Sequence, residues 1–88
     1  MIVQFSKRGW DDYLAVQEED SKMLKRINGL IKECQRHPFV GTGKPEPLKD
    51  QLKGWWSRRI TQEDRLVYRV SGTGTDQILE IIQCRFHY

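Results

Sequence analysis

A few side chains in this sequence could move protons. Glu46 lies between Pro45 and Pro47, and the chain ends in His87 and Tyr88. Proline restricts its own backbone and that of the residue before it, so the Glu46 carboxylate has few directions open to it. Carboxylates and imidazoles commonly serve as general bases and acids. Glu46 and His87 are therefore candidates for acid–base chemistry.

Such a pair suits the cleavage of RNA through its own 2′-hydroxyl group. Glu46 could take the 2′-OH proton and His87 could protonate the leaving 5′-oxygen, each contributing typically about 10²- to 10⁴-fold to the rate. Arg65 and Lys49 would stabilise the charge that develops on the phosphate. Tyr88 could stack on a base or bond a phosphate. This chemistry needs no metal or cofactor, and the sequence has no spacing typical of metal ligands or of a P-loop.

Other basic side chains could hold an RNA phosphate. They are Lys44, Arg58, Arg59 and Arg85. The net charge of +3 and the pI of about 9.0 favour an anionic partner, although modest positive charge also keeps proteins soluble.

Each of these features also has an ordinary structural explanation. A glutamate in a proline-containing loop is more often a surface residue than a base. Arginines that alternate along a strand usually solvate an exposed face, and a terminal His-Tyr is usually incidental. From the residues alone, a basic RNA- or ribosome-binding module is favoured over an RNA-cleaving enzyme.

Hydrophobic spacing predicts the elements that position these residues. Ile2–Phe5 is a β-prone run, and Ser6 is a suitable N-cap for a first helix. One stripe of that helix is predicted to comprise Trp10, Tyr13, Leu14 and Gln17, which fall at helical spacing, with Asp11, Asp12 and Glu18 on the other side. A second helix begins at Asp20 or Ser21 and ends before Pro38. Its buried face is predicted to comprise Met23, Leu24, Ile27, Leu30, Ile31 and Cys34.

The second half of the chain predicts strands. Residues 37–54 hold all three prolines and are expected to be irregular. Alternation predicts strands at 55–60, 65–70 and 77–88, joined by short turns into an antiparallel meander. With the N-terminal strand, this is an α+β fold in which a two-helix hairpin packs on one face of a mainly antiparallel four-stranded sheet. The other face is predicted to carry Arg59, Arg65, Arg85 and His87.

Composition limits the class of protein. The chain has 88 residues, of which 38% are hydrophobic and 31% charged, and this predicts one globular domain over residues 1–88. Cys34 and Cys84 lie in apolar runs and are expected to be reduced core residues. We expect no signal peptide and no membrane span, and hence a cytoplasmic protein.

Several segments match one known family in order and spacing. They are Trp10–Tyr13, Ile27–Asn28, Leu30–Lys32, Gly43–Lys49, Trp56–Ile60, Arg65–Tyr68, Cys84–Arg85 and His87–Tyr88. In these segments the chain resembles the YoeB toxins, within the RelE/ParE-like superfamily of bacterial toxin–antitoxin systems. It departs from that family in the turn Ser71–Asp76, which is slightly longer than is usual in the family, and at Phe86, where family members usually have a tyrosine.

The resemblance implies a RelE-like fold and a ribosome-dependent endonuclease that cleaves mRNA in the A site of the 70S ribosome. It implies Glu46 as general base and His87 as general acid, with Arg65 and Tyr88 completing the catalytic set. Arg59 and Lys49 match positions that help to hold the RNA phosphate.

The resemblance also implies partners. These are a YefM-type antitoxin whose C-terminal segment would fold onto the toxin, a second copy of the chain in a homodimer, and operator DNA for the antitoxin complex. A non-catalytic member of the same fold, such as the ParE branch that inhibits DNA gyrase, is the alternative. That branch is not expected to keep the Glu, Arg and terminal His-Tyr set.

Overall fold

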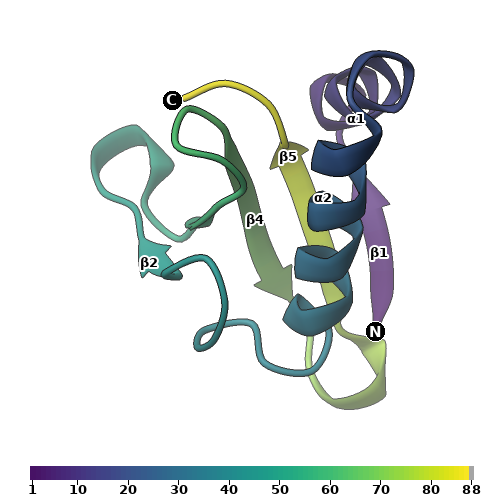
Figure 1. The fold of residues 1–88 in the computed structure, drawn as a ribbon. Coiled ribbons are helices and arrows are strands. Elements are labelled where there is room, and N and C mark those ends of the chain that lie inside the picture. The colour runs from purple at the N-terminus through teal and green to yellow at the C-terminus, as the bar shows by residue number, and fades with distance from the viewer. Residues whose placement is uncertain (88) are drawn as a thin grey trace.

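A computed structural model describes residues 1–87, which form two helices against one face of a five-stranded sheet (Figure 1). The elements are β1 (Ile2–Phe5), α1 (Lys7–Glu19), α2 (Ser21–Cys34), β2 (Glu46–Pro47), β3 (Trp56–Arg59), β4 (Arg65–Ser71) and β5 (Ile78–Gln83). The strand order is β1-β5-β4-β3-β2, in which β1 is parallel to β5 and the other pairs are antiparallel. Single turns of 3₁₀-helix lie at Asp50–Leu52 and Gly74–Asp76. The predicted α+β class and helix hairpin are confirmed.

The sheet has five strands where four were expected, because part of the proline-rich segment pairs with β3. Glu46 lies opposite Ser57, and Pro47 lies opposite Trp56. A proline has no N–H to donate to a ladder, so it is tolerated here on the outermost strand. The backbone on either side continues the contact, with Arg59 N donating to Gly43 O at 2.7 Å. The expectation that Glu46 lies in irregular structure was therefore wrong.

Both helices begin directly after N-cap residues that the sequence predicted. The Ser6 side chain accepts a hydrogen bond from Gly9 N, and the Asp20 side chain accepts one from Met23 N. The predicted face of α2 is confirmed, since its apolar residues join the core formed with strands β4 and β5. Within residues 1–87, neither helix is long and apolar enough to cross a membrane.

The buried face of α1 differs from the predicted stripe. Gly9 and Val16 are buried, whereas Trp10 and Leu14 are 47% and 39% exposed. The reason is the close approach of α1 to β5: a Cβ atom at Gly9 would lie 2.5 Å from the carbonyl oxygen of Ile81. Only a residue without a side chain allows the two backbones to come so near.

A β-bulge in β5 changes which side chains face the helices. Tyr68 of β4 pairs with Ile81, but its neighbour Val67 pairs with Gln83, so Ile82 is an extra residue. Strict alternation would place Gln83 on the same face as Ile81. The bulge instead moves Gln83 to the face that Val67 occupies and returns Cys84 to the core.

The chain does not continue as a strand to its end. β5 ends at Gln83, and the segment after it runs past the beginning of β4, where Arg65 lies (yellow in Figure 1). Phe86 has a φ of +65°, a conformation that a strand does not contain. The predicted strand over 77–88 is therefore wrong for residues 84–87, and Tyr88 lies outside the residues that the structure describes.

Candidate functional site

The sheet face away from the helices gathers the predicted base and two of the predicted cations. Cross-strand pairing aligns Glu46 with Ser57 and Ser57 with Val67. Two residues along β3 and β4, in the direction of the β3–β4 turn, Arg59 pairs with Arg65. Because side chains two residues apart share a face, all five lie on one surface, which we call the outer face.

Arg65 lies on the outer face, but its guanidinium also makes hydrogen bonds within the fold. It is only 9% exposed, and its Nη1 donates to the carbonyl oxygens of Thr61, Gln62 and Asp64 at 2.9–3.1 Å. The guanidinium thereby closes the β3–β4 turn. Among residues 1–87, the hydrogen bonds of this guanidinium are made by Nη1.

The segment that leads to His87 is fixed beside Arg65. The backbone N–H of Arg65 donates to Phe86 O at 3.0 Å, and the side-chain amide of Gln83 donates to the same oxygen at 3.0 Å. The Asp64 carboxylate accepts from Phe86 N at 2.7 Å. His87 is exposed and follows this anchored residue directly.

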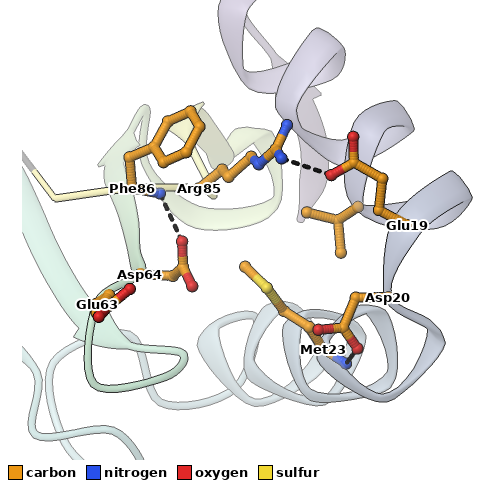
Figure 2. A pocket seen from close by; sticks show the side chains of 8 residues that line it. Glu19, Asp20, Met23, Glu63, Asp64, Arg85 and Phe86 are labelled. Atoms are coloured by element: carbon orange, nitrogen blue, oxygen red, sulfur yellow. Dashed lines mark hydrogen bonds and ion pairs between the residues drawn. The ribbon is translucent and has the colours of Figure 1, made fainter.

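Earlier in the same segment, helix α1 provides two further contacts. The Asp12 carboxylate accepts from Cys84 N at 3.2 Å, and Glu19 forms an ion pair with Arg85 (Figure 2). Arg85 therefore lies on the helix side, and its predicted place on the outer face was wrong. Its guanidinium also covers the ring of Phe86 at 4.7 Å.

A pocket of about 360 Å³ separates this segment from the helices (Figure 2). Carboxylates surround it on several sides. Its lining consists of Val16, Glu19, Asp20, Met23, Glu63, Asp64, Arg85 and Phe86. This acidic lining does not suit an RNA phosphate.

Arg58 is an interior residue and not a surface cation. It is fully buried, and its Nε donates to the Tyr68 hydroxyl at 3.1 Å. Its Nη1 donates to Glu33 and to Thr42 O, and its Nη2 donates to the carbonyl oxygens of His37 and Val40. All five N–H donors of the guanidinium are thus used within the protein. The expectation that Arg58 contacts RNA was wrong.

This buried cluster anchors the loop that precedes Glu46. Hydrogen bonds from the backbone and hydroxyl of Thr42, with the Arg58 cation beside them, hold the pKa of Glu33 below its usual range. Burial raises the pKa of Tyr68 to about 12, so its hydroxyl stays protonated and can donate to Pro38 O.

The remaining predicted residues are surface cations or lie at the end of the chain. Lys44 and Lys49 flank β2 and are exposed, as is Arg59. Lys44 has a φ of +52°, where the chain turns into the strand. Tyr88 lies outside the residues that the structure describes. Among residues 1–87, no three His, Cys, Asp or Glu side chains converge to hold a metal ion.

Sequence reasoning missed several residues that organise this site. Asp12, Glu33, Asp64 and Gln83 all make side-chain contacts that position the loop or the terminal segment. Each is a common polar residue whose contact is not evident from a local pattern: three of the partners are distant in sequence, and Gln83 reaches Phe86 only because a bulge changes its face. One available signal was the position of Asp64, directly before the candidate Arg65 in a predicted turn.

Comparison with known proteins gives consistent matches along the chain. Residues 5–88 match the model of the YoeB-like toxin of bacterial type II toxin–antitoxin systems. The chain is 57% identical over 88 residues to Toxin YoeB of Escherichia coli K12, with all of both chains covered.

Solved structures agree. A YoeB/ParE toxin from Agrobacterium tumefaciens superposes with a TM-score of 0.97 at 56% identity, over 100% of both chains. YoeB of Staphylococcus aureus, at 43% identity, has been solved as a dimer, with a TM-score of 0.88, and in a heterotetrameric complex with YefM, with a TM-score of 0.87. Each of these two matches covers 100% of this chain and 98% of the other.

Proposed function

Because this chain belongs to the YoeB-like toxins of bacterial type II toxin–antitoxin systems, we propose that it is a ribosome-dependent mRNA endonuclease. It cleaves mRNA in the ribosomal A site and so inhibits translation. The substrate class is single-stranded RNA held by the ribosome, and the attacking group is the 2′-hydroxyl of the RNA itself.

In the proposed reaction, Glu46 takes the proton of the 2′-OH, which attacks the adjacent phosphorus atom. The bond to the 5′-oxygen breaks, and His87 supplies the proton that this oxygen needs on leaving. The products are a 2′,3′-cyclic phosphate and a 5′-hydroxyl end. Arg65 and Lys49 stabilise the charge on the phosphorane. Arg59 and Lys44 hold the flanking backbone, and Tyr88 positions the RNA.

One observation carries most of this proposal. The pairing of β2, β3 and β4 puts Glu46 on the same face as Arg59 and Arg65, and the backbone of Arg65 bonds the residue before His87. This arrangement supports the proposal that a base, a cation and an acid from three distant parts of the chain act together. A ribosome-binding module without catalysis would not need this combination.

The deciding experiment is primer extension on mRNA in translating ribosomes. Wild-type protein is expected to create new 5′ ends, and the double variant Glu46→Ala, His87→Ala is expected to create none. A chain lacking only His87 and Tyr88 should also be inactive. The midpoint temperature of its thermal unfolding should equal that of the wild type. If wild type gives no new ends, or the double variant gives the same ends, the enzyme proposal fails and a binding module is favoured.

We also propose that a YefM-type antitoxin neutralises this toxin and that the free toxin forms a homodimer. The relatives from Staphylococcus aureus assemble in both ways. By extension from the family, the antitoxin complex binds operator DNA. Light scattering on the purified toxin, alone and with its antitoxin, tests the two assemblies. A toxin that remains monomeric at tens of micromolar would exclude the dimer.

A further inference from the structure

Phe86 is held by both of its backbone groups, although its side chain is 55% exposed. Its N–H donates to Asp64 Oδ1, and its carbonyl oxygen accepts from Arg65 N and from Gln83 Nε2. Its φ of +65° is unusual for a phenylalanine and persists only where the surroundings impose it. Three hydrogen bonds therefore fix one backbone unit that buries little apolar surface of its own.

We propose that Asp64 and Gln83 are positioning residues that hold Phe86 and thereby place the imidazole of His87 for proton transfer. The proposal rests on the proposed function of His87 as the general acid. The last residues of a chain normally fray unless they are tied down. Here the residue next to the acid is tied on both sides, so His87 has little backbone freedom left.

Asp64 is itself fixed before it reaches Phe86. Its Oδ2 accepts from the Thr61 hydroxyl at 2.7 Å, and its backbone N–H donates to Thr61 Oγ1 at 3.0 Å. The Arg65 guanidinium closes the same turn through three carbonyl oxygens. The carboxylate that holds Phe86 therefore belongs to a rigid turn, which is what accurate positioning requires.

Gln83 reaches Phe86 because of the bulge at Ile82. Without the bulge, strict alternation would place Gln83 on the same face as Ile81, in the core. With it, the amide is on the outer face, 5% exposed and bonded to Phe86 O. Bulges often re-aim a side chain beside an active site. This bulge lets Gln83 hold the carbonyl oxygen of Phe86, while Asp64 holds its N–H group. We call these two contacts the clamp.

The variants Asp64→Ala and Gln83→Met test the clamp through cleavage kinetics on programmed ribosomes. A small displacement of a catalytic group can cost about 10²-fold in rate, so we expect kcat to fall about 10- to 100-fold for Asp64→Ala with KM unchanged. Gln83→Met should cost less, since Arg65 N still bonds Phe86 O. Asp64→Asn keeps an oxygen for Phe86 N and should recover most of the rate.

Glu63→Ala is the matched control. Glu63 neighbours Asp64 on the same turn, lines the same pocket and carries the same charge. Its removal should leave kcat and KM at wild-type values. If Glu63→Ala and Asp64→Ala lower kcat equally, the effect is one of charge and the positioning proposal is overturned.

Combination with His87→Ala separates positioning from general structure. If Asp64 acts through His87, adding Asp64→Ala to His87→Ala should cause no further loss of rate. Independent losses that multiply would overturn the proposal. If His87→Ala alone leaves the rate unchanged, it is the proposed function that fails.

A second readout does not depend on activity. The backbone order parameter of His87, measured by NMR relaxation on the free protein, should fall in Asp64→Ala and remain at the wild-type value in Glu63→Ala. An unchanged order parameter in Asp64→Ala would overturn the clamp whether or not the protein cleaves RNA.

Discussion

Arg58 and Arg59 are adjacent in β3 but have different environments. Arg58 is fully buried with all five donors engaged, whereas Arg59 is exposed on the outer face. Arg58→Met removes the donor of several acceptors in the interior, namely the Tyr68 hydroxyl and the carbonyl oxygens of His37, Val40 and Thr42. It should therefore lower the free energy of unfolding by about 2–4 kcal/mol. Urea denaturation measures this loss.

The same substitution one residue later is the control. Arg59→Met should change the free energy of unfolding by about 0.5 kcal/mol or less, because the side chain is exposed. It should nevertheless weaken mRNA cleavage if Arg59 holds a phosphate. Equal destabilisation by both variants would contradict the assignment of Arg58 to the interior.

Glu33 makes the stability of this cluster depend on pH. Hydrogen bonds from Thr42 and the nearby Arg58 lower its pKa from the ordinary value of 4.5. A carboxyl with a lowered pKa in the folded state stabilises the fold above its unfolded pKa, and this contribution disappears as the pH falls through the folded pKa. Glu33→Gln should therefore be less stable than wild type at pH 7.

The difference between the two proteins should begin to shrink as the pH falls below 4.5, where Glu33 of the unfolded chain becomes protonated, and should vanish only below the lowered pKa of the folded state. Thermal unfolding at several pH values between 7 and 3 measures it. Glu18→Gln, the same charge change at an exposed position of α1, controls for net charge. A difference that stays constant over this range would show that Glu33 acts without its charge.

Residue by residue, alternation predicted which sheet face a side chain occupies better than it predicted the partners that the side chain contacts. Arg59 and Arg65 were predicted to share the face away from the helices, and their pairing confirms it. Alternation places Arg58 on the opposite face from Arg59, but it does not show that Arg58 is buried, because its carboxylate partner Glu33 lies 25 residues away on α2. Alternation gives the face of a side chain but not the partner that meets it there.

At the scale of elements, long periodic patterns were predicted well and chain ends were not. The face of α2 follows from its apolar spacing, and both N-caps follow from local chemistry. After the end of β5, the backbone N–H groups of Cys84 and Phe86 donate to the Asp12 and Asp64 carboxylates, and no local pattern reveals these contacts or the bulge. The short β2 strand likewise exists only because β3 is beside it.

Gly9 tests how closely α1 must approach the sheet. A Cβ atom there would lie 2.5 Å from Ile81 O, which is backbone and cannot turn aside. Gly9→Ala should therefore lower the free energy of unfolding by about 1–3 kcal/mol, despite the better helix propensity of alanine. Differential scanning calorimetry measures the change.

Gly29, in the exposed part of α2, is the matched control. A Cβ atom there has no other atom within 4 Å, so Gly29→Ala should stabilise the protein by about 0.5–1 kcal/mol. Opposite signs for the two variants are expected. Stabilisation by both would mean that α1 can move away from β5 at little cost.

In the molecule as a whole, the hydrophobic core and the proposed site lie on opposite faces of one sheet. The helices and the core occupy one face, and the proposed chemistry occupies the other. The outer face can therefore carry Glu46 and several cations without burying them in the core. Side chains of α1 and of the β3–β4 turn also fix the segment before His87, because they accept hydrogen bonds from its backbone.

The two cysteines report whether that terminal segment opens separately from the rest of the molecule. Cys34 of α2 and Cys84 after β5 are both fully buried, and burial raises the pKa of Cys84 to about 12. Since the thiolate is the reactive form, both should resist a thiol reagent at pH 8 and react at the rate of global unfolding. Mass spectrometry of iodoacetamide-treated protein, digested at several times, measures each rate.

The contacts of Asp12, Asp64 and Gln83 predict equal protection of the two cysteines. If Cys84 reacts more than about tenfold faster than Cys34, the terminal segment opens locally and cannot hold His87 in one place.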